Sequence, residues 1–135
     1  MKFVFVDTFY FLAILNVRDP AHVRAREWIR TFSGTLVTSE WVWVELADAM
    51  SPTRHRGLFA SIRNQFLQGK SRRIVAFDDS IYQEALLHYD ARPDKKWSLT
   101  DCTSFAVMRR EGLADALTAD HHFEQAGYVP LLKPV

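Results

Sequence analysis

The chain has 135 residues, of which 48% are hydrophobic, so it is long enough for one domain with a substantial core and too short for two. Its 17 Lys and Arg residues nearly balance its 16 Asp and Glu residues, so the net charge gives no argument for a nucleic-acid or membrane partner. The single cysteine, Cys102, excludes an internal disulfide, and no apolar run approaches the roughly 20 residues that cross a bilayer. We therefore expect one domain over residues 1–135 with no membrane partner, and a cytoplasmic location because the first residues lack a secretory signal pattern.

Strand-like and helix-like segments alternate along the chain. In chain order, we expect a strand over 2–6, helices over 8–15 and 19–32, a strand over 35–38, helices over 39–50 and 51–69, a strand over 72–77, helices over 78–92 and 98–111, a strand over 114–119, a helix over 120–127 and an edge strand over 128–132. Asp19 and Pro20 are typical of an N-cap and first helical residue, Ser98 of an N-cap, and Gly112 of a helix end. The alternation predicts right-handed βαβ units and an α/β fold, a three-layer α/β/α sandwich with a mainly parallel sheet.

Acidic residues lie where such a sheet places its ligands, beyond the carboxyl ends of the strands. Asp7 and Asp120 each follow directly on a predicted strand, and Asp101 lies in the first turn of the helix over 98–111 with apolar residues on its own face. Each also has a purely structural interpretation. Asp7 and Asp120 could cap the helices that follow them, and Asp101 could complete a capping box with Ser98.

Glu45 is harder to explain structurally, because Trp41, Val42 and Ala49 share its side of the predicted helix. Burying an unpaired carboxylate is costly, so Glu45 requires either a basic residue or a metal ion as its partner. If all four acids met at one rim, each pair at ~4 Å would cost about 4 kcal/mol at an effective dielectric near 20. A divalent cation would relieve this repulsion, and oxygen ligands favour Mg²⁺ or Mn²⁺. The pattern therefore predicts metal-assisted phosphodiester chemistry.

Four blocks of the sequence resemble, in order and spacing, the signature blocks of PIN-domain proteins, above all VapC-like toxins of toxin–antitoxin pairs. The blocks are FVDTFYFLAIL, VTSEWVWVELADAM, SLTDCTSFAVMRREG and ALTADHHFEQAGYVPLL. The resemblance covers essentially the whole chain and implies a single PIN-like domain, an endoribonuclease dependent on Mg²⁺ or Mn²⁺, an RNA substrate, a homodimer and inhibition by a small antitoxin. By position, it implies that Asp7, Glu45, Asp101 and Asp120 are catalytic and that Asp7, Asp101 and Asp120 hold the metal.

One position departs from the pattern, because many relatives carry a further acid where this chain has His122. The difference leaves the choice between one and two metal ions open. His121 and His122 could contact phosphate or donate protons, or they could simply lie at a helix start. Thr8 and Thr100, each beside an acid, are expected to orient the metal ligands through their hydroxyls.

A basic stretch is the first candidate for contact with RNA phosphates, since no acid occurs between Ala49 and Phe77. The residues that we expect to bind RNA are Arg54, Arg56, Arg72, Arg73, Trp97, His121 and His122. The arginines could instead form a solvated face or meet an acidic antitoxin tail. Trp97 is expected in an exposed, Lys-rich segment, where its ring could stack on a base, although tryptophans more often pack in a core or an interface.

Two classes of function therefore remain from the sequence. The first is a divalent-metal-dependent endoribonuclease that acts as a toxin or, alternatively, as a housekeeping RNA-processing nuclease. The second is a non-catalytic PIN-like module that binds RNA or a protein. A phosphatase of the haloacid dehalogenase type is excluded, because its second acid would fall at Phe9, and a receiver domain is excluded because paired acids beside the first strand are missing.

Overall fold

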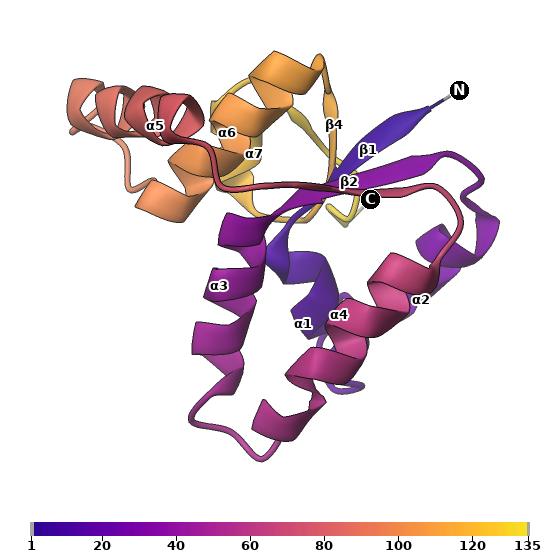
Figure 1. Ribbon diagram of the computed structural model, residues 1–135. Helices are drawn as coiled ribbons and strands as arrows, with labels where there is room; N and C mark the ends of the chain where they lie inside the picture. Colours follow the sequence, from indigo (N-terminus) through magenta and orange to yellow (C-terminus); the bar gives the residue numbers. More distant parts are fainter. Residues whose placement is uncertain (1, 135) are drawn as a thin grey trace.

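A five-stranded parallel sheet forms the centre of the molecule (Figure 1), and the computed structural model describes residues 2–134. The strands are β1 (Phe3–Val6), β2 (Thr35–Ser39), β3 (Arg72–Val75), β4 (Asp115–Leu117) and β5 (Val129–Pro130). Their order across the sheet is β3-β2-β1-β4-β5, and every pairing is parallel. The expected α/β class with a parallel sheet is therefore confirmed.

Helices cover both faces of the sheet. The helices are α1 (Thr8–Leu15), α2 (His22–Thr31), α3 (Glu40–Met50), the 3-10 turn η1 (Arg56–Leu58), α4 (Phe59–Gln68), α5 (Asp79–Ala91), α6 (Leu99–Glu111) and α7 (His121–Gln125). Figure 1 shows α1 to α4 on one side and α5 to α7 on the other. None of the helices among residues 2–134 is long and apolar enough to cross a bilayer.

Strands β1 and β2 form the centre of the core: β1 is a short apolar run, and all five residues of β2 are buried although three of them are Thr or Ser. Val4, Phe5 and Val6 have no exposed surface, as expected for a parallel sheet that is covered by helices on both sides. The chain builds β1, β2 and β3 toward one edge and then returns to place β4 on the other side of β1. The strand order therefore reverses between β1 and β4, and the carboxyl ends of these two strands border the crevice where ligands bind in such folds.

Two predicted helix starts are wrong, and in both cases a local turn replaces the first helical turn. Asp19 does not cap a helix, because α2 begins only at His22. Instead, Asp19 closes a turn: its Oδ1 accepts from the Ala21 N–H at 2.8 Å, and its carbonyl accepts from the His22 N–H at 2.9 Å. The helix expected over 51–69 is α4 alone, preceded by η1. Thr53 folds the residues before it by donating to the Met50 carbonyl and accepting from the His55 N–H.

Four of the five strands are also shorter than expected, β2 is one residue longer, and the ends of α6 agree with the sequence. Strand β4 stops at Leu117 because the Thr118 N–H turns back to the Ala116 carbonyl at 3.0 Å. Helix α6 begins after Ser98 and ends at Gly112, whose φ of 68° lies in the left-handed region that favours glycine. The chain after Leu117 therefore leaves the strand pairing next to the carboxyl end of β1, where the crevice lies.

Candidate functional site

Asp7 lies at the carboxyl end of β1, and its side chain is buried with only 5% of its surface exposed. The carboxylate makes no capping hydrogen bond to α1; its Oδ2 instead accepts a hydrogen bond of 2.8 Å from the Thr118 hydroxyl. The pKa of Asp7 is raised to about 7, mainly by burial. The hydrogen bond from Thr118 lowers this pKa, and the charges of Glu45, Asp101 and Asp120 raise it. The structural interpretation of Asp7 as a helix cap is therefore wrong.

Asp101 is held at the start of α6 by a complete capping box. Its N–H donates to the Ser98 hydroxyl and its Oδ2 accepts from the Ser98 N–H, both at 3.0 Å. The same Oδ2 lies 2.9 Å from Nδ1 of His122. Burial is the main cause that raises the pKa of Asp101, and the charge of Asp120 adds to it. The cap thus fixes a buried carboxylate that belongs to the same acidic cluster as Asp7.

Glu45 and Asp120 complete this cluster from α3 and from the start of α7. The pKa of Glu45 is raised by burial and by the charges of Asp101 and Asp120. Among residues 2–134, Glu45 forms no ion pair with a basic side chain, so one of its two expected kinds of partner is absent there. Asp120 does cap α7, because its Oδ1 accepts from the His122 N–H at 2.9 Å, and its charge still reaches the other three acids.

Thr118 is a site residue that the sequence reasoning missed. Its hydroxyl donates to Asp7 Oδ2 and accepts from the Asp120 N–H at 3.1 Å, so one side chain connects the ends of β1 and β4. The available signal was a hydroxyl residue two positions before an acid, a spacing typical of a side-chain-to-backbone turn. Thr8 Oγ1 is buried near Glu45 and lowers its pKa but makes no hydrogen bond of regular geometry. The ligand-orienting roles of Thr8 and Thr100 stay predictions.

Two histidines border the acidic cluster. Nδ1 of His122 lies between two carboxylates, 2.9 Å from Asp101 Oδ2 and 3.5 Å from Asp120 Oδ1. His121 is mostly exposed, and its Nδ1 lies 3.7 Å from Asp120 Oδ1. Asp120, His121 and His122 offer ligand atoms that all lie within 4.8 Å of one another. His122 thus places a nitrogen ligand atom beside the carboxylates.

The donor set fits a hard divalent cation. Four carboxylates meet with no lysine or arginine paired to them in the described part of the chain, and burial raises the pKa of three of them. A bound cation would favour the charged carboxylates and so lower their pKa values. The buried Thr8 hydroxyl, which lacks a regular partner, adds one more oxygen next to Glu45. The arrangement is chemically suited to hold a metal ion over the end of the sheet.

The basic stretch does not lie at this rim. Arg54 and Arg56 belong to the loop that joins α3 to α4, at the end of these helices away from the sheet (Figure 1). Arg72 lies at the amino end of the edge strand β3, whereas Asp7 follows the carboxyl end of the central strand β1. Arg73 forms an ion pair of 2.6 Å with Glu111 at the far end of α6. The structure therefore separates these arginines from the acids.

Trp97 is buried, so its expected exposure is wrong. Only 7% of its surface is exposed, its Nε1 donates to Gln125 Oε1 at 3.1 Å, and its ring packs edge-on against Phe105. The ring fixes the segment before α6 to helix α7. Core packing, the other interpretation of this residue, is the one that the structure supports.

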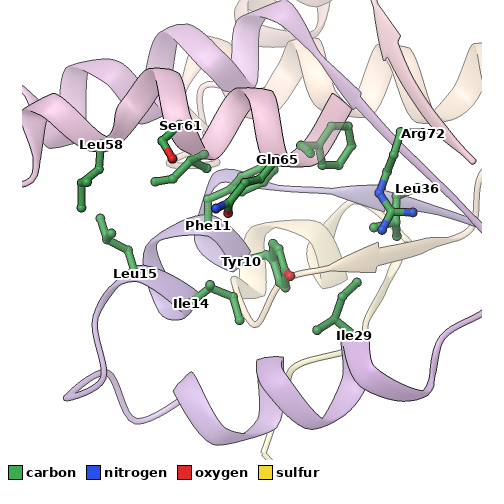
Figure 2. Close-up of a pocket in the computed structure, with 12 residues that line it drawn as sticks. Tyr10, Phe11, Ile14, Leu15, Ile29, Leu36, Leu58, Ser61, Gln65 and Arg72 are labelled. Atoms are coloured by element: carbon green, nitrogen blue, oxygen red, sulfur yellow. The ribbon is translucent and has the colours of Figure 1, made fainter. Parts of the chain in front are cut away.

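An apolar groove lies away from the acids, between α1, α2 and α4. Figure 2 shows the side chains that face into it, and its volume is about 400 Å³. Tyr10 projects into the groove, and burial raises the pKa of its hydroxyl to about 12. At one end, the Arg72 guanidinium lies 5.7 Å from the centre of the Phe66 ring. The groove therefore offers an apolar floor with one cationic end.

Comparison with known proteins gives a consistent result. The family model described as PIN domain matches residues 4–128. The chain is 30% identical over 129 residues to the 23S rRNA-specific endonuclease VapC20 of Mycobacterium tuberculosis (strain CDC 1551 / Oshkosh), covering 93% of this chain and 95% of the relative.

Solved structures agree with the sequence match. The crystal structure of Mycobacterium tuberculosis VapC20, described as a sarcin–ricin loop cleaving toxin, superposes with a TM-score of 0.85 at 25% identity, covering 93% of this chain and 96% of that one. FitAcB from Neisseria gonorrhoeae superposes with a TM-score of 0.66 at 17% identity over 94% of both chains, which shows the fold alone. The expected fold and family resemblance are confirmed.

Replacing Asp7 by Asn should stabilise the metal-free protein at neutral pH. The pKa of Asp7 is about 7 in the folded protein against 3.8 for an ordinary aspartate, so the unfolded chain loses this proton first and stability falls as the pH rises from about 4 to 7. Above that range Asp7→Asn should gain on the order of 4 kcal/mol in the free energy of unfolding, measured by denaturant titration in EDTA, and the gain should vanish near pH 4.

A matched control is Asp94→Asn, because the Arg92 guanidinium lowers the pKa of Asp94 to about 2. This exposed variant should not gain stability at neutral pH. Equal unfolding curves for Asp7→Asn and the parent protein at pH 8 would contradict the assignment of a buried, repelled carboxylate.

Proposed function

The chain belongs to the PIN-domain family, and from this premise we propose that it is a divalent-metal-dependent endoribonuclease and the toxin of a toxin–antitoxin pair. The observation that carries the proposal is the meeting of Asp7, Glu45, Asp101 and Asp120 at one rim of the sheet, where burial and neighbouring negative charges raise the pKa values of the first three. Carboxylates kept together at this cost are suited to a cation and a phosphate, whereas a protein that only binds RNA has no need of them.

In the proposed site, Asp7, Asp101 and Asp120 hold Mg²⁺ or Mn²⁺. A divalent ion held there supplies activation of water and compensates charge on the phosphate as the RNA bond breaks. Each of the three carboxylates already has a fixing contact: the Thr118 hydroxyl for Asp7, the Ser98 N–H for Asp101 and a backbone N–H of α7 for Asp120. These contacts hold the ligands in one orientation, which favours binding because little side-chain freedom is lost.

Glu45 has a different proposed role, because its half-buried carboxyl group has a raised pKa and no fixing ion pair among the described residues. A carboxylate whose pKa is raised toward neutral pH is a better proton acceptor. We assign to Glu45 the removal of a proton from the attacking water. No side chain has to act as a nucleophile in this scheme.

The first RNA to test is the sarcin–ricin loop of the large ribosomal RNA, since the Mycobacterium tuberculosis relative carries that specificity in its description. Asp7→Asn and Asp101→Asn should each reduce cleavage of this loop by at least about 100-fold, because each removes a charged ligand. The measurement is the cleavage rate of a labelled RNA in Mg²⁺ or Mn²⁺, with circular dichroism to verify folding. EDTA should abolish cleavage by the parent protein.

Asp115→Asn is the matched control, because Asp115 lies at the other end of β4 and pairs with Lys2 instead of the acidic cluster. This variant should cleave at the parent rate. RNA binding without metal-dependent cleavage would favour the non-catalytic module. Cleavage without growth arrest on expression in cells would favour a housekeeping nuclease, whereas an arrest that Asp101→Asn relieves supports the toxin.

We further propose that the apolar groove of Figure 2 binds a segment of a small antitoxin. The groove is lined by apolar side chains of α1, α2 and α4, and Arg72 supplies a positive charge for an acidic segment at one end. An apolar groove between helices with one charged end suits an amphipathic peptide. Because the groove lies away from the acids, the antitoxin segment would bind outside the catalytic site.

Leu58→Asp should weaken binding of the antitoxin at least about tenfold, because it places a charge in the groove. Leu67→Asp is the control: Leu67 lies on α4 outside the groove, and its side chain is 48% exposed against 45% for Leu58. The measurement is co-purification and titration with the product of a small reading frame adjacent to the gene. Equal affinity of both variants would contradict this placement.

We also propose a homodimer that uses the exposed aromatic patch formed by Trp41, Phe77 and Tyr82. Phe77 is 59% exposed and meets Trp41 edge-on at 5.4 Å, and the patch borders a hollow of about 340 Å³. Exposed aromatic side chains that gather at one place are typical of protein interfaces. A second copy of the chain would cover this surface from the side of α3 and α5.

Phe77→Ser should shift the protein from dimer to monomer, because it removes the most exposed ring of the patch. Light scattering coupled to size-exclusion chromatography measures the mass at several protein concentrations. Phe3→Ser serves as the control, since Phe3 is 43% exposed and lies at the opposite end of the sheet. A dimer that persists in Phe77→Ser would assign the interface elsewhere.

A further inference from the structure

Two lysines beside the acidic rim remain free of ion pairs. Lys95 and Lys96 lie in the loop between α5 and α6, and neither ammonium group forms a salt bridge within residues 2–134. Many arginines, by contrast, are bound to carboxylates and have little charge to offer a ligand. The arginines in ion pairs are Arg30, Arg63, Arg73, Arg92, Arg109 and Arg110.

A cavity of about 560 Å³ lies at these lysines, and we call it the α5–α6 cavity. It is lined by residues at the end of α5 and in the loop that follows: Tyr89, Asp90, Arg92, Pro93, Lys95, Lys96, Trp97 and Ser98. Ser98 also bonds to Asp101 through its hydroxyl and its N–H, both at 3.0 Å. The cavity therefore reaches the residue that holds one carboxylate of the proposed catalytic site.

The loop that carries the lysines is fixed at several points. Trp97 is buried and donates to Gln125 of α7, and the Arg92 guanidinium lies 5.4 Å from the centre of the Trp97 ring. Arg92 also binds both carboxylate oxygens of Asp94, at 3.0 and 2.9 Å, and the Lys95 N–H closes a turn onto the Arg92 carbonyl. The backbone of Lys95 and Lys96 is thereby held next to the start of α6.

We propose that the α5–α6 cavity binds the phosphate backbone of an RNA strand that continues from the scissile bond, with Lys95 and Lys96 as its contacts. The assignment rests on the proposed endoribonuclease function. A rim of four carboxylates repels the phosphates on either side of the bond to be cut, so the strand needs unpaired cations next to that rim. Tyr89 is 50% exposed and offers a ring on which an unpaired base can stack.

Distance favours this cavity over the basic stretch of the sequence. Only Trp97 separates Lys96 from Ser98, so the Cα atoms of these two residues lie within about 7.6 Å of each other. Arg54 and Arg56 lie beyond the end of α3 that points away from the sheet (Figure 1), and the segment from Glu45 to Met50 already extends about 7.5 Å along the helix axis. When the scissile phosphate of an RNA strand lies at the acids, the phosphates next to it can reach the α5–α6 cavity. The α3–α4 loop is farther from the acids.

The test measures RNA affinity in a protein that does not cut its ligand. In an Asp7→Asn background with EDTA, fluorescence anisotropy follows a labelled single-stranded oligoribonucleotide over a range of salt concentrations. Lys95→Ala/Lys96→Ala should weaken binding roughly tenfold at 0.1 M salt and reduce the slope of log Kd against log salt by about 1.4, as expected for two lost phosphate contacts. Arg54→Ala/Arg56→Ala removes the same charge and should bind like the background protein.

A second readout in the active protein separates binding from structure. Lys95→Ala/Lys96→Ala should raise KM for RNA cleavage with little change in kcat, and its affinity for Mn²⁺, measured by calorimetry, should equal that of the parent. Unchanged affinity for RNA, or an equal loss in Arg54→Ala/Arg56→Ala, would overturn the assignment while leaving the endoribonuclease proposal in place. If the parent neither binds nor cleaves RNA, the proposed function itself is wrong.

Discussion

The Thr118 hydroxyl joins the two strand ends on which the acidic site depends. It donates to Asp7 after β1 and accepts from the N–H of Asp120 after β4, so a single oxygen fixes both positions. The hydroxyl can reach both because β1 and β4 are parallel neighbours, with Val6 opposite Leu117 at their carboxyl ends. Parallel pairing brings residues that are far apart in the chain to one edge, and the hydrogen bonds then set their orientation.

Aromatic packing beneath the rim holds the same elements together. The rings of Phe5 in β1 and Phe123 in α7 lie 6.4 Å apart, and the rings of Phe105 in α6 and Phe123 lie 5.1 Å apart. All three side chains are fully buried. They belong to the elements that bear or adjoin Asp7, Asp101 and Asp120, so the energy of core packing opposes the repulsion between the carboxylates. The site is therefore a region of electrostatic strain supported by a well-packed core.

Charges of opposite sign are sorted to different parts of the molecule. The acids occupy the crevice between β1 and β4, unpaired lysines border the α5–α6 cavity beside it, and Arg72 lies at the amino end of the edge strand β3. A balanced net charge of +1 hides this arrangement, since it sums over surfaces that face different ligands. A metal ion, an RNA strand and an acidic protein segment would each meet a separate surface.

Features that depend on neighbouring residues could be predicted from the sequence alone. The alternation of short apolar runs with helical segments predicted the parallel α/β fold, because periodicity is a local property. The position of Asp7 and Asp120 after strands and the capping box of Ser98 and Asp101 were also evident, since caps and strand ends involve residues a few positions apart. Three of the four acids could be named in this way, and the apolar residues on its side of the helix identified Glu45.

Contacts between residues that are far apart in the sequence depend on tertiary packing and could not be predicted from local patterns. The hydrogen bond from Thr118 to Asp7 joins residues 111 positions apart, and Trp97 donates to Gln125, 28 positions away. No local sequence pattern predicts these two contacts. Arg54 and Arg56 follow the helix of Glu45 closely in sequence, but that helix carries them away from the rim. The direction in which each element leaves the sheet, and the long-range packing that sets it, decide which side chains share a site.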